Sequence, residues 1–347
     1  MERKSRMKSE GIFLIKNGSP EVAFDRRAMD IASPQGLNVM IEVESFGLNF
    51  ADVMARKGLY QDAPPMPCIV GYEVVGKVIE LGPDANPDLL GKRVIGFCRF
   101  GGYAKHVITQ DHATVVVDDQ PSGELLSLCT QGVTAYYMAE YLCPIHADDK
   151  VLIHAAAGGV GSLLIQLAKN KGAKVYAKVG SDNKMKVVQD MGADVAINYN
   201  KNDYSTVIQN DLKSSKLDFS FNPAGGSTFK KDLNLLGSGG RIVLFGGSEL
   251  SNSKWGIFSK LNFVRKMGLI LPIGLMMKSR NILGVNMLRI ADDKPLVLRH
   301  CLQEVVKLYN QKVLVPHVGG VFDISELNKA HHALEGGLTT GKLVVTW

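Results

Sequence analysis

Short runs of alternating apolar and polar residues occupy the first third of the chain. The runs cover residues 39–43, 73–79, 93–97, 103–108 and 114–117, with glycine and proline between them. A period of two is typical of half-buried strands, and the frequent turns favour a compact antiparallel barrel. We therefore expect a mainly β domain at residues 11–130, rejoined by residues 305–347, and a disordered tail at residues 1–10.

The pattern changes after about residue 130, where apolar runs alternate with helical patterns. Apolar residues recur at helical spacing from Val160 to Ala168, and Gly172 stands where a glycine would end that helix. Alternating strands and helices predict a doubly wound parallel sheet over residues 131–304. Strands are expected at 150–154, 174–179, 195–198, 217–221, 241–245, 282–286 and 342–346, and further helices at 183–191, 204–212, 229–236 and 295–310.

Composition and charge narrow the classes of partner and compartment. The net charge is +6 without a basic stripe interleaved with aromatic residues, so a nucleic-acid partner is not expected. The five cysteines are scattered and include no CxxC pair, which is typical of reduced thiols and predicts a cytoplasmic protein. The most apolar stretch, residues 269–277, is far shorter than the roughly 20 residues that span a bilayer.

A small-residue loop at residues 155–161, Ala-Ala-Ala-Gly-Gly-Val-Gly, joins a predicted strand to a predicted helix. Small residues let the backbone approach a pyrophosphate, and the helix N-terminus offers free N–H groups and positive potential. The alternative is a glycine-rich turn without a ligand. We expect a dinucleotide cofactor here, bound by Ala157, Gly158, Gly159 and Val160.

The turn after the second predicted strand bears on which dinucleotide is bound. An NAD site usually places an acidic residue there, whereas this chain has Gly180 and Ser181, with Lys184 one turn on. A hydroxyl and an ammonium group suit the 2′-phosphate of NADPH. Two alternatives remain: Asp182 could be the acidic residue displaced by two positions, or Ser181 could be only a helix cap.

Several longer motifs resemble those of medium-chain dehydrogenases/reductases, which combine a GroES-like domain with a Rossmann domain. They are Pro67-x-x-x-Gly71-x-Glu73-x-x-Gly76, residues 91–96 and residues 101–104, and the likeness covers nearly the whole chain from about residue 12. Residues 156–161 with Gln166 and Lys169 are similar to the quinone oxidoreductase signature. Residues 47–52 and 55–60 resemble the vesicle amine transport protein homologues, a branch of that family.

The resemblance implies an enzyme without zinc. Zinc alcohol dehydrogenases of the superfamily place a cysteine where this chain has Asn49 and a histidine where it has Tyr72, and they carry a four-cysteine lobe that is missing here. The eight histidines form no convincing metal-ligand set, so we expect no metal. Without a Lewis acid to polarise an alcohol, quinones or α,β-unsaturated carbonyls are the expected small-molecule substrates.

The resemblance also implies roles for polar residues near the nicotinamide. Asn49 is similar to the family asparagine that faces cofactor and substrate, and Thr134, close to Gln131, is similar to the threonine at the start of the domain-linking helix. Tyr60 matches a proposed proton donor of some enoyl reductases. Tyr60 or water would supply the proton, or Tyr60 is a cleft-lining aromatic residue with a structural hydrogen bond. For Asp52 we favour a structural role.

Further cofactor contacts are expected at the carboxyl ends of later strands, where open α/β sheets bind their ligands. The strand-end candidates are Asn222, Phe245, Gly246, Gly247, Val285 and Asn286. Tyr199 and Lys342, which have a weaker signal, complete the predicted site.

Residues 250–280 form an insert that mixes apolar and basic residues. We favour a wall or lid of the substrate site, or a dimer contact, and peripheral membrane contact is the alternative. Family members commonly pair through the last strand of the Rossmann sheet, so residues 282–287 suit a homodimer edge. A protein that binds NADPH but catalyses little, as a membrane-associated or sensor protein, is the alternative to a reductase.

Overall fold

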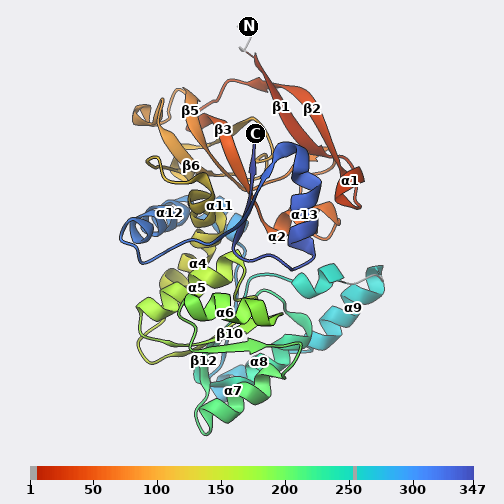
Figure 1. The fold of residues 1–347 in the computed structure, drawn as a ribbon, viewed down its shortest axis with the longest axis vertical. Coiled ribbons are helices and arrows are strands. Elements are labelled where there is room, and N and C mark those ends of the chain that lie inside the picture. The colour runs from red at the N-terminus through yellow and green to blue at the C-terminus, as the bar shows by residue number, and fades with distance from the viewer. Residues whose placement is uncertain (1–5, 253–255) are drawn as a thin grey trace. The chain divides into compact units, whose positions relative to one another are not determined.

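The computed structural model describes residues 6–252 and 256–347, which divide into two compact units (Figure 1). Unit 1 comprises the chain up to Val133, Leu288–Asn310 and Pro316–Trp347. Unit 2 comprises Thr134–Met287 and Gln311–Val315. Part of the predicted tail, residues 1–5, and residues 253–255 of the insert lie outside the described residues.

Unit 1 is built on two mainly antiparallel sheets. The smaller has the order β2-β1-β4, and the larger has the order β15-β16-β3-β5-β6-β8, with β7 also paired to β3. The strands are β1 (Arg6–Leu14), β2 (Phe24–Ala32), β3 (Asn38–Leu48), β4 (Cys68–Ile69), β5 (Glu73–Leu81), β6 (Arg93–Phe97), β7 (His106–Gln110), β8 (Thr114–Val116), β15 (Val318–Asp323) and β16 (Lys342–Thr346).

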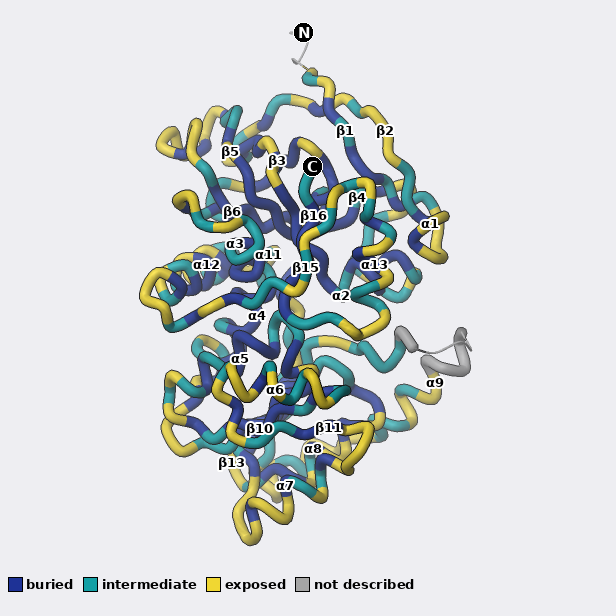
Figure 2. Tube along the Cα trace, in the orientation of Figure 1, coloured by how far each residue is buried: buried dark blue, intermediate teal, exposed yellow. Residues whose placement is uncertain are grey.

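The C-terminal strand joins the first part of the chain, as predicted. Strand β16 pairs antiparallel with β3 and parallel with β15, with Leu343 opposite Leu48. Strand β3 is buried along most of its length, so it forms the centre of the core (Figure 2). The helices of this unit are α1 (Pro20–Ala23), α2 (Phe50–Arg56), α3 (Ser122–Leu126), α12 (Pro295–Asn310) and α13 (Leu327–Glu335), and α11 (Met287–Asp293) begins at its boundary.

Unit 2 confirms the doubly wound sheet. Its six strands are all parallel, in the order β11-β10-β9-β12-β13-β14. Because the order reverses between β9 and β12, the switch point at which such sheets bind ligands lies at the carboxyl ends of these two strands. The strands are β9 (Lys150–Ile153), β10 (Lys174–Val179), β11 (Val195–Asn198), β12 (Leu217–Asn222), β13 (Leu236–Leu244) and β14 (Asn281–Gly284).

Four helices of unit 2 follow the predicted ranges, and two further helices, which were not predicted, lie in the insert. Helix α5 (Gly159–Asn170) buries Leu163, Leu164 and Leu167, and Gly172 follows it with a φ of 84°. That left-handed conformation favours glycine, which explains why the helix ends there. The others are α6 (Asp182–Asp190), α7 (Tyr204–Leu212), α8 (Phe229–Leu235), α9 (Gly256–Met267) and α10 (Pro272–Lys278).

Three expectations differ from the structure. Residues 6–10 are not a disordered tail, because they begin β1, which pairs with β2 residue by residue and carries the cross-strand ion pair between Lys8 and Asp30. A continuous helical run, not predicted, extends from Ser122 to Leu142, so Thr134 lies within a helix and not at its start. Helix α12 belongs entirely to unit 1, where it packs on β8, whereas the predicted boundary fell at residue 304.

Candidate functional site

The loop after β9 has the geometry of a phosphate cradle. Gly158 caps α5 and donates its N–H to the Ala155 carbonyl at 2.8 Å. A Cβ on Gly161 would lie 2.5 Å from Ala155 O and 2.7 Å from Ala156 Cα, so only glycine lets the helix start so close to the loop. The first N–H groups of α5, from Gly159 onward, have no acceptor within the helix and remain available for an anion.

The residues expected near a 2′-phosphate lie together beyond β10. Ser181 is the N-cap of α6, but its side chain accepts no capping hydrogen bond, so the cap alone does not explain it. The Asp182 carboxylate accepts from Asn198 Nδ2 at 2.7 Å and pairs with Lys201. These partners turn Asp182 toward β11, which argues against a displaced ribose-binding acid. Lys184 is half-buried, and burial lowers its pKa.

Gly180 lies against the side chain of Tyr199. A Cβ at this position would lie 3.0 Å from the hydroxyl of Tyr199, so the tyrosine side chain fills the space beside Gly180. Tyr199 itself is 48% exposed, and its N–H bonds to Val179 O at 3.0 Å. The Tyr199 side chain therefore lies against Gly180, which directly precedes Ser181 in the chain.

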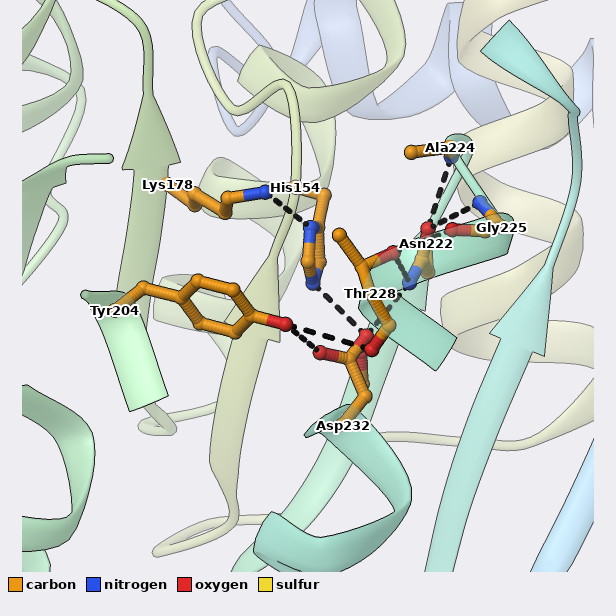
Figure 3. A network of polar contacts seen from close by, with 9 residues as sticks. His154, Lys178, Tyr204, Asn222, Ala224, Gly225, Thr228 and Asp232 are labelled. Carbon is orange, nitrogen blue, oxygen red and sulfur yellow. Dashed lines mark hydrogen bonds and ion pairs between the residues drawn. The ribbon is translucent and has the colours of Figure 1, made fainter. Parts of the chain in front are cut away.

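A buried polar network lies at the carboxyl ends of β9, β10 and β12 (Figure 3). Its centre is Asp232, which is fully buried and accepts from Tyr204 Oη and Ser220 Oγ at 2.7 Å. His154 Nε2 lies 2.9 Å from Asp232 Oδ2, and Lys178 Nζ lies 3.3 Å from His154 Nδ1. His154, Lys178 and Asp232 were not predicted as site residues from the sequence. The position of His154 directly before the dinucleotide loop was the only available signal.

Asn222 belongs to this network, and its predicted contact with the cofactor stays a prediction. Its Oδ1 accepts from the N–H groups of Ala224 and Gly225, both at 2.9 Å. Its Nδ2 donates to Asp232 Oδ2 at 2.6 Å and to Thr228 Oγ1 at 2.8 Å. The amide is fully buried and fully used within unit 2, so Asn222 shapes the turn after β12.

The other strand-end residues lie where they were expected. Phe245, Gly246 and Gly247 follow β13, and a Cβ on Gly246 would lie 2.7 Å from Pro223 O, so two strand-end loops approach closely. Val285 follows β14 and bonds to Leu244 O at 2.8 Å, and Asn286 after it is exposed.

In unit 1 a buried ion pair holds Asn49. Asn49 follows β3, Glu73 begins β5 and Lys342 begins β16. Lys342 pairs with Glu73 and donates to Asn49 Oδ1 at 3.0 Å and to Leu48 O at 3.1 Å. Asn49 Nδ2 donates to Glu73 Oε1 at 2.8 Å, and Glu73 Oε2 accepts from Thr130 N–H at 2.6 Å. Both charged side chains are fully buried.

This arrangement fixes the amide of Asn49 and gives Lys342 a structural role, while its predicted contact with the cofactor stays a prediction. Glu73 only accepts and Lys342 only donates, so the Asn49 amide has one orientation, with its second N–H left to offer. The three donors of Lys342 are all taken within unit 1. Gly47 makes the pair possible, because a Cβ there would collide with Lys342 and Glu73. The sequence marks Glu73 only as part of the motif that begins at Pro67, and its buried ion pair was not predicted.

Two titratable groups lie near Asn49 in the sequence. Asp52 is fully buried in the first turn of α2, where its Oδ2 accepts from Asn49 N–H at 2.7 Å, as its predicted structural role requires. Burial raises the pKa of Asp52 to about 7. Burial, with the nearby carboxylates of Asp62 and Asp52, raises the pKa of Tyr60 to about 12. The Tyr60 ring meets the buried ring of Tyr72 edge-on, with 6.2 Å between centroids.

The two remaining predicted residues lie on the helical run from Ser122 to Leu142. Gln131 and Thr134 are each 9% exposed.

Among residues 6–252 and 256–347, no three His, Cys, Asp or Glu side chains gather in a way that could hold a metal ion. Over the same residues, no helix is both long and apolar enough to cross a membrane.

Two family models match the chain. One, described as alcohol dehydrogenase GroES-like domain, matches residues 35–142, and the other, described as zinc-binding dehydrogenase, matches residues 159–303. The chain is 28% identical to mouse quinone oxidoreductase-like protein 2 over 312 residues, covering 89% of this chain and 84% of the relative.

Two further comparisons concern a vesicle protein and a solved structure. The chain is 26% identical to the zebrafish synaptic vesicle membrane protein VAT-1 homolog over 89% of its own length, but it spans only 64% of that relative. The structure of mycobacterial Rv1454c complexed with NADPH superposes with a TM-score of 0.81 at 26% identity, covering 98% of this chain and 100% of the other.

Proposed function

The chain belongs to the medium-chain dehydrogenase/reductase family, and from that premise we propose that it is an NADPH-dependent reductase of quinones or α,β-unsaturated carbonyls that works without zinc. The observation that carries the choice of cofactor is the turn after β10. Ser181 and Lys184 offer a hydroxyl and an ammonium group, while the carboxylate of Asp182 between them is engaged by Asn198 and Lys201.

The rest of the cofactor would be held by the loop after β9. Its glycines leave the backbone accessible, and the first N–H groups of α5 point out of the helix toward the loop. The mycobacterial relative's complex with NADPH supports this assignment. When bound, NADPH supplies the hydride for the reaction.

Lys184→Met tests the proposed cofactor. Charge-assisted hydrogen bonds contribute about 1.5–3 kcal/mol, so the variant should bind NADPH about 10- to 100-fold more weakly. NADH lacks the 2′-phosphate, so its affinity should not change. Fluorescence titration of the purified protein with each cofactor measures both constants. Lys186→Met, an exposed lysine on the same helix, is the matched control and should leave both unchanged. Equal loss for NADPH and NADH would reject the assignment.

The proposed chemistry rests on the second N–H of Asn49. Glu73 and Lys342 fix the amide, so this N–H can stabilise negative charge that develops on a substrate oxygen, without reorganising first. The proton would come from Tyr60 or from water. With its pKa raised to about 12, Tyr60 stays protonated at neutral pH and donates only to a strongly basic centre such as an enolate.

The residues at the family's zinc-ligand positions do not fit zinc. The Asn49 amide is occupied by Glu73 and Lys342, and the ammonium group of Lys342 already places a cation against the amide oxygen. At the other position, burial raises the pKa of Tyr72 far above its usual range, so its phenol is a poor ligand. We therefore propose activated acceptors, which need no metal to polarise them.

Asn49→Ala and Tyr60→Phe test the proposed roles. Removing an oxyanion donor costs about 10²–10³ in kcat, and removing a general acid costs about 10²–10⁴. Both variants should keep the wild-type Kd for NADPH. If Asn49→Ala lowers kcat and Tyr60→Phe does not, water is the proton donor. Tyr141→Phe, at a position 48% exposed, is the control. Unchanged turnover in both variants would contradict the proposed site.

A protein that binds NADPH but catalyses little is the second candidate. The observation that favours it is that Tyr60, the one titratable member of the proposed catalytic pair, has a pKa raised to about 12. Helix α10 and the segment before it expose Leu269, Met276 and Met277 beside basic residues, which suits peripheral membrane contact. Flotation with anionic liposomes tests this contact, and its absence would leave the segment as a lid or a dimer contact.

We also propose a cytoplasmic homodimer. All five cysteines are free and buried, as expected for a reducing compartment. Strand β14 ends the parallel sheet of unit 2 and pairs only with β13 within the described chain, so its outer edge is open to a second copy. Light scattering coupled to size exclusion measures the oligomeric state.

A further inference from the structure

Lys178 is a half-buried cation with an unusual set of neighbours. Its Nζ donates to His154 Nδ1 at 3.3 Å and lies 4.7 Å from the ring centroid of Tyr204 (Figure 3). The ring centroid of Tyr199 also lies 4.7 Å from this nitrogen. Within the described part of the chain, no carboxylate oxygen lies within 4.0 Å of this nitrogen. Two aromatic faces and a neutral imidazole compensate poorly for the lost hydration of an ammonium group.

The direction of the hydrogen bond between Lys178 and His154 follows from the chemistry of the two groups. Lys178 only donates, so His154 Nδ1 is the acceptor and the proton of the ring lies on Nε2, toward Asp232. Burial lowers the pKa of His154, which keeps the ring neutral. A chain of contacts therefore runs from the fully buried Asp232 through His154 and Lys178 to the exposed ring of Tyr199.

Lys178 also touches both halves of the proposed cofactor site. Its carbonyl accepts from Ala156 N–H in the dinucleotide loop at 3.1 Å, and its ammonium group lies against the Tyr199 ring that covers Gly180. Gly180 is followed directly by Ser181, one of the two proposed phosphate ligands. An anion at that turn would give Lys178 the counter-charge that the described residues do not place in contact with it.

We propose that Lys178 is a positioning residue that determines specificity for the 2′-phosphate of NADPH, because it holds Tyr199 beside Ser181 and adds positive charge behind the ring. The inference rests on the proposed NADPH cofactor. Lys178 acts through Tyr199 and not by direct contact, so its effect should be selective for the phosphorylated cofactor and should depend on the tyrosine ring.

The test compares two lysines of the same strand. Lys174, at the other end of β10, also lies over a tyrosine ring, 5.3 Å from Tyr176, and pairs with Asp211 at 2.5 Å. NADPH and NADH are titrated into each purified full-length variant. Because a cation–π contact contributes about 0.5–2 kcal/mol, Lys178→Met should weaken NADPH binding roughly two- to thirtyfold and leave NADH binding unchanged. Lys174→Met should change neither constant.

Two further variants separate charge from packing. Lys178→Arg keeps a cation that stacks on tyrosine and should retain NADPH affinity within about twofold. Lys178→Gln keeps a donor for His154 without the charge, so it should lose NADPH affinity as Lys178→Met does. It also provides a second neutral variant if the methionine variant fails to fold. In a double-mutant cycle with Tyr199→Leu, the double variant should bind NADPH no more weakly than the weaker-binding single variant.

The outcomes distinguish this inference from the proposed function. A wild-type protein that prefers NADH would overturn the proposed cofactor, and this inference with it. A wild-type protein that prefers NADPH, with neutral Lys178 variants that keep the preference, would overturn only the inference. Equal losses of affinity for NADPH and NADH would indicate a purely structural role and would also overturn the inference. Additive losses of NADPH affinity in the cycle with Tyr199→Leu would overturn it as well.

Discussion

Lys342→Met should destabilise unit 1 by about 3–5 kcal/mol, the cost of leaving one member of a buried ion pair without its partner. Glu73 and Lys342 are both fully buried, and among the described residues Glu73 would keep the N–H donors of Asn49 and Thr130. Hydrogen exchange, measured by mass spectrometry on peptides from β3, β5 and β16, reports the free energy of opening this unit alone.

The matched controls for this prediction separate the ion pair from the loss of a lysine. Lys342→Met combined with Glu73→Gln removes both charges and should recover more than half of the lost stability. Lys329→Met breaks the exposed pair with Glu326 in α13 of the same unit and should leave exchange in these strands unchanged. A Lys342→Met variant as stable as the wild type would show that the buried pair does not stabilise unit 1.

The stability of unit 1 should fall as pH rises from 4 to 7, because of Asp52. Its pKa is about 7 in the folded protein and about 3.9 in an unfolded chain, so the folded state holds the proton longer. The stabilisation is therefore complete below pH 4 and lost as pH rises through 7. Between pH 5 and pH 8 this single group should cost about 2–3 kcal/mol, from 1.36 kcal/mol per pKa unit.

Asp52→Asn tests that dependence, since an amide does not titrate. Its oxygen can still accept from Asn49 N–H, and any cost of the new amide group is the same at every pH. Exchange protection in β3 and α2 should then fall less between pH 5 and pH 8 than in the wild type. Asp182→Asn is the control, because the Lys201 and Asn198 contacts lower the pKa of Asp182 and keep its titration below this range. Equal slopes for wild type and Asp52→Asn would refute the assignment.

The fold could be predicted from the sequence wherever a helical spacing or a short apolar run marked an element. Helix α5 follows its helical spacing, and strands β10, β11 and β16 match their predicted ranges because each is a short, largely apolar run. The N-terminal strand was missed because charged residues alternate along Arg6–Glu10, and cross-strand pairing with β2 stabilises it despite low burial. Strand β13 begins before its apolar run, over a glycine-rich segment that the pattern assigns to a turn.

The parts of the candidate site that the backbone forms could be predicted from the sequence. The contacts between side chains from different elements could not. The loop 155–161 and the turn at Gly180 and Ser181 were found because glycine and small residues carry their own signal. The structural roles of Asn222 and Lys342 could not be predicted, because they depend on Asp232 and Glu73, which lie on other elements. Nothing in the spacing along one chain indicates which carboxylate will meet which amine across a sheet.

The measurement that tests the central claim most directly is oxidation of NADPH by the wild-type protein, followed at 340 nm across a panel of quinones and α,β-unsaturated carbonyls. Metal chelator should be present throughout, because the proposed site uses no zinc. The account predicts turnover with at least one acceptor, retained in chelator, and a kcat/KM that is at least about tenfold higher with NADPH than with NADH. Saturable NADPH binding with no consumption above the buffer rate, for every acceptor, would contradict it.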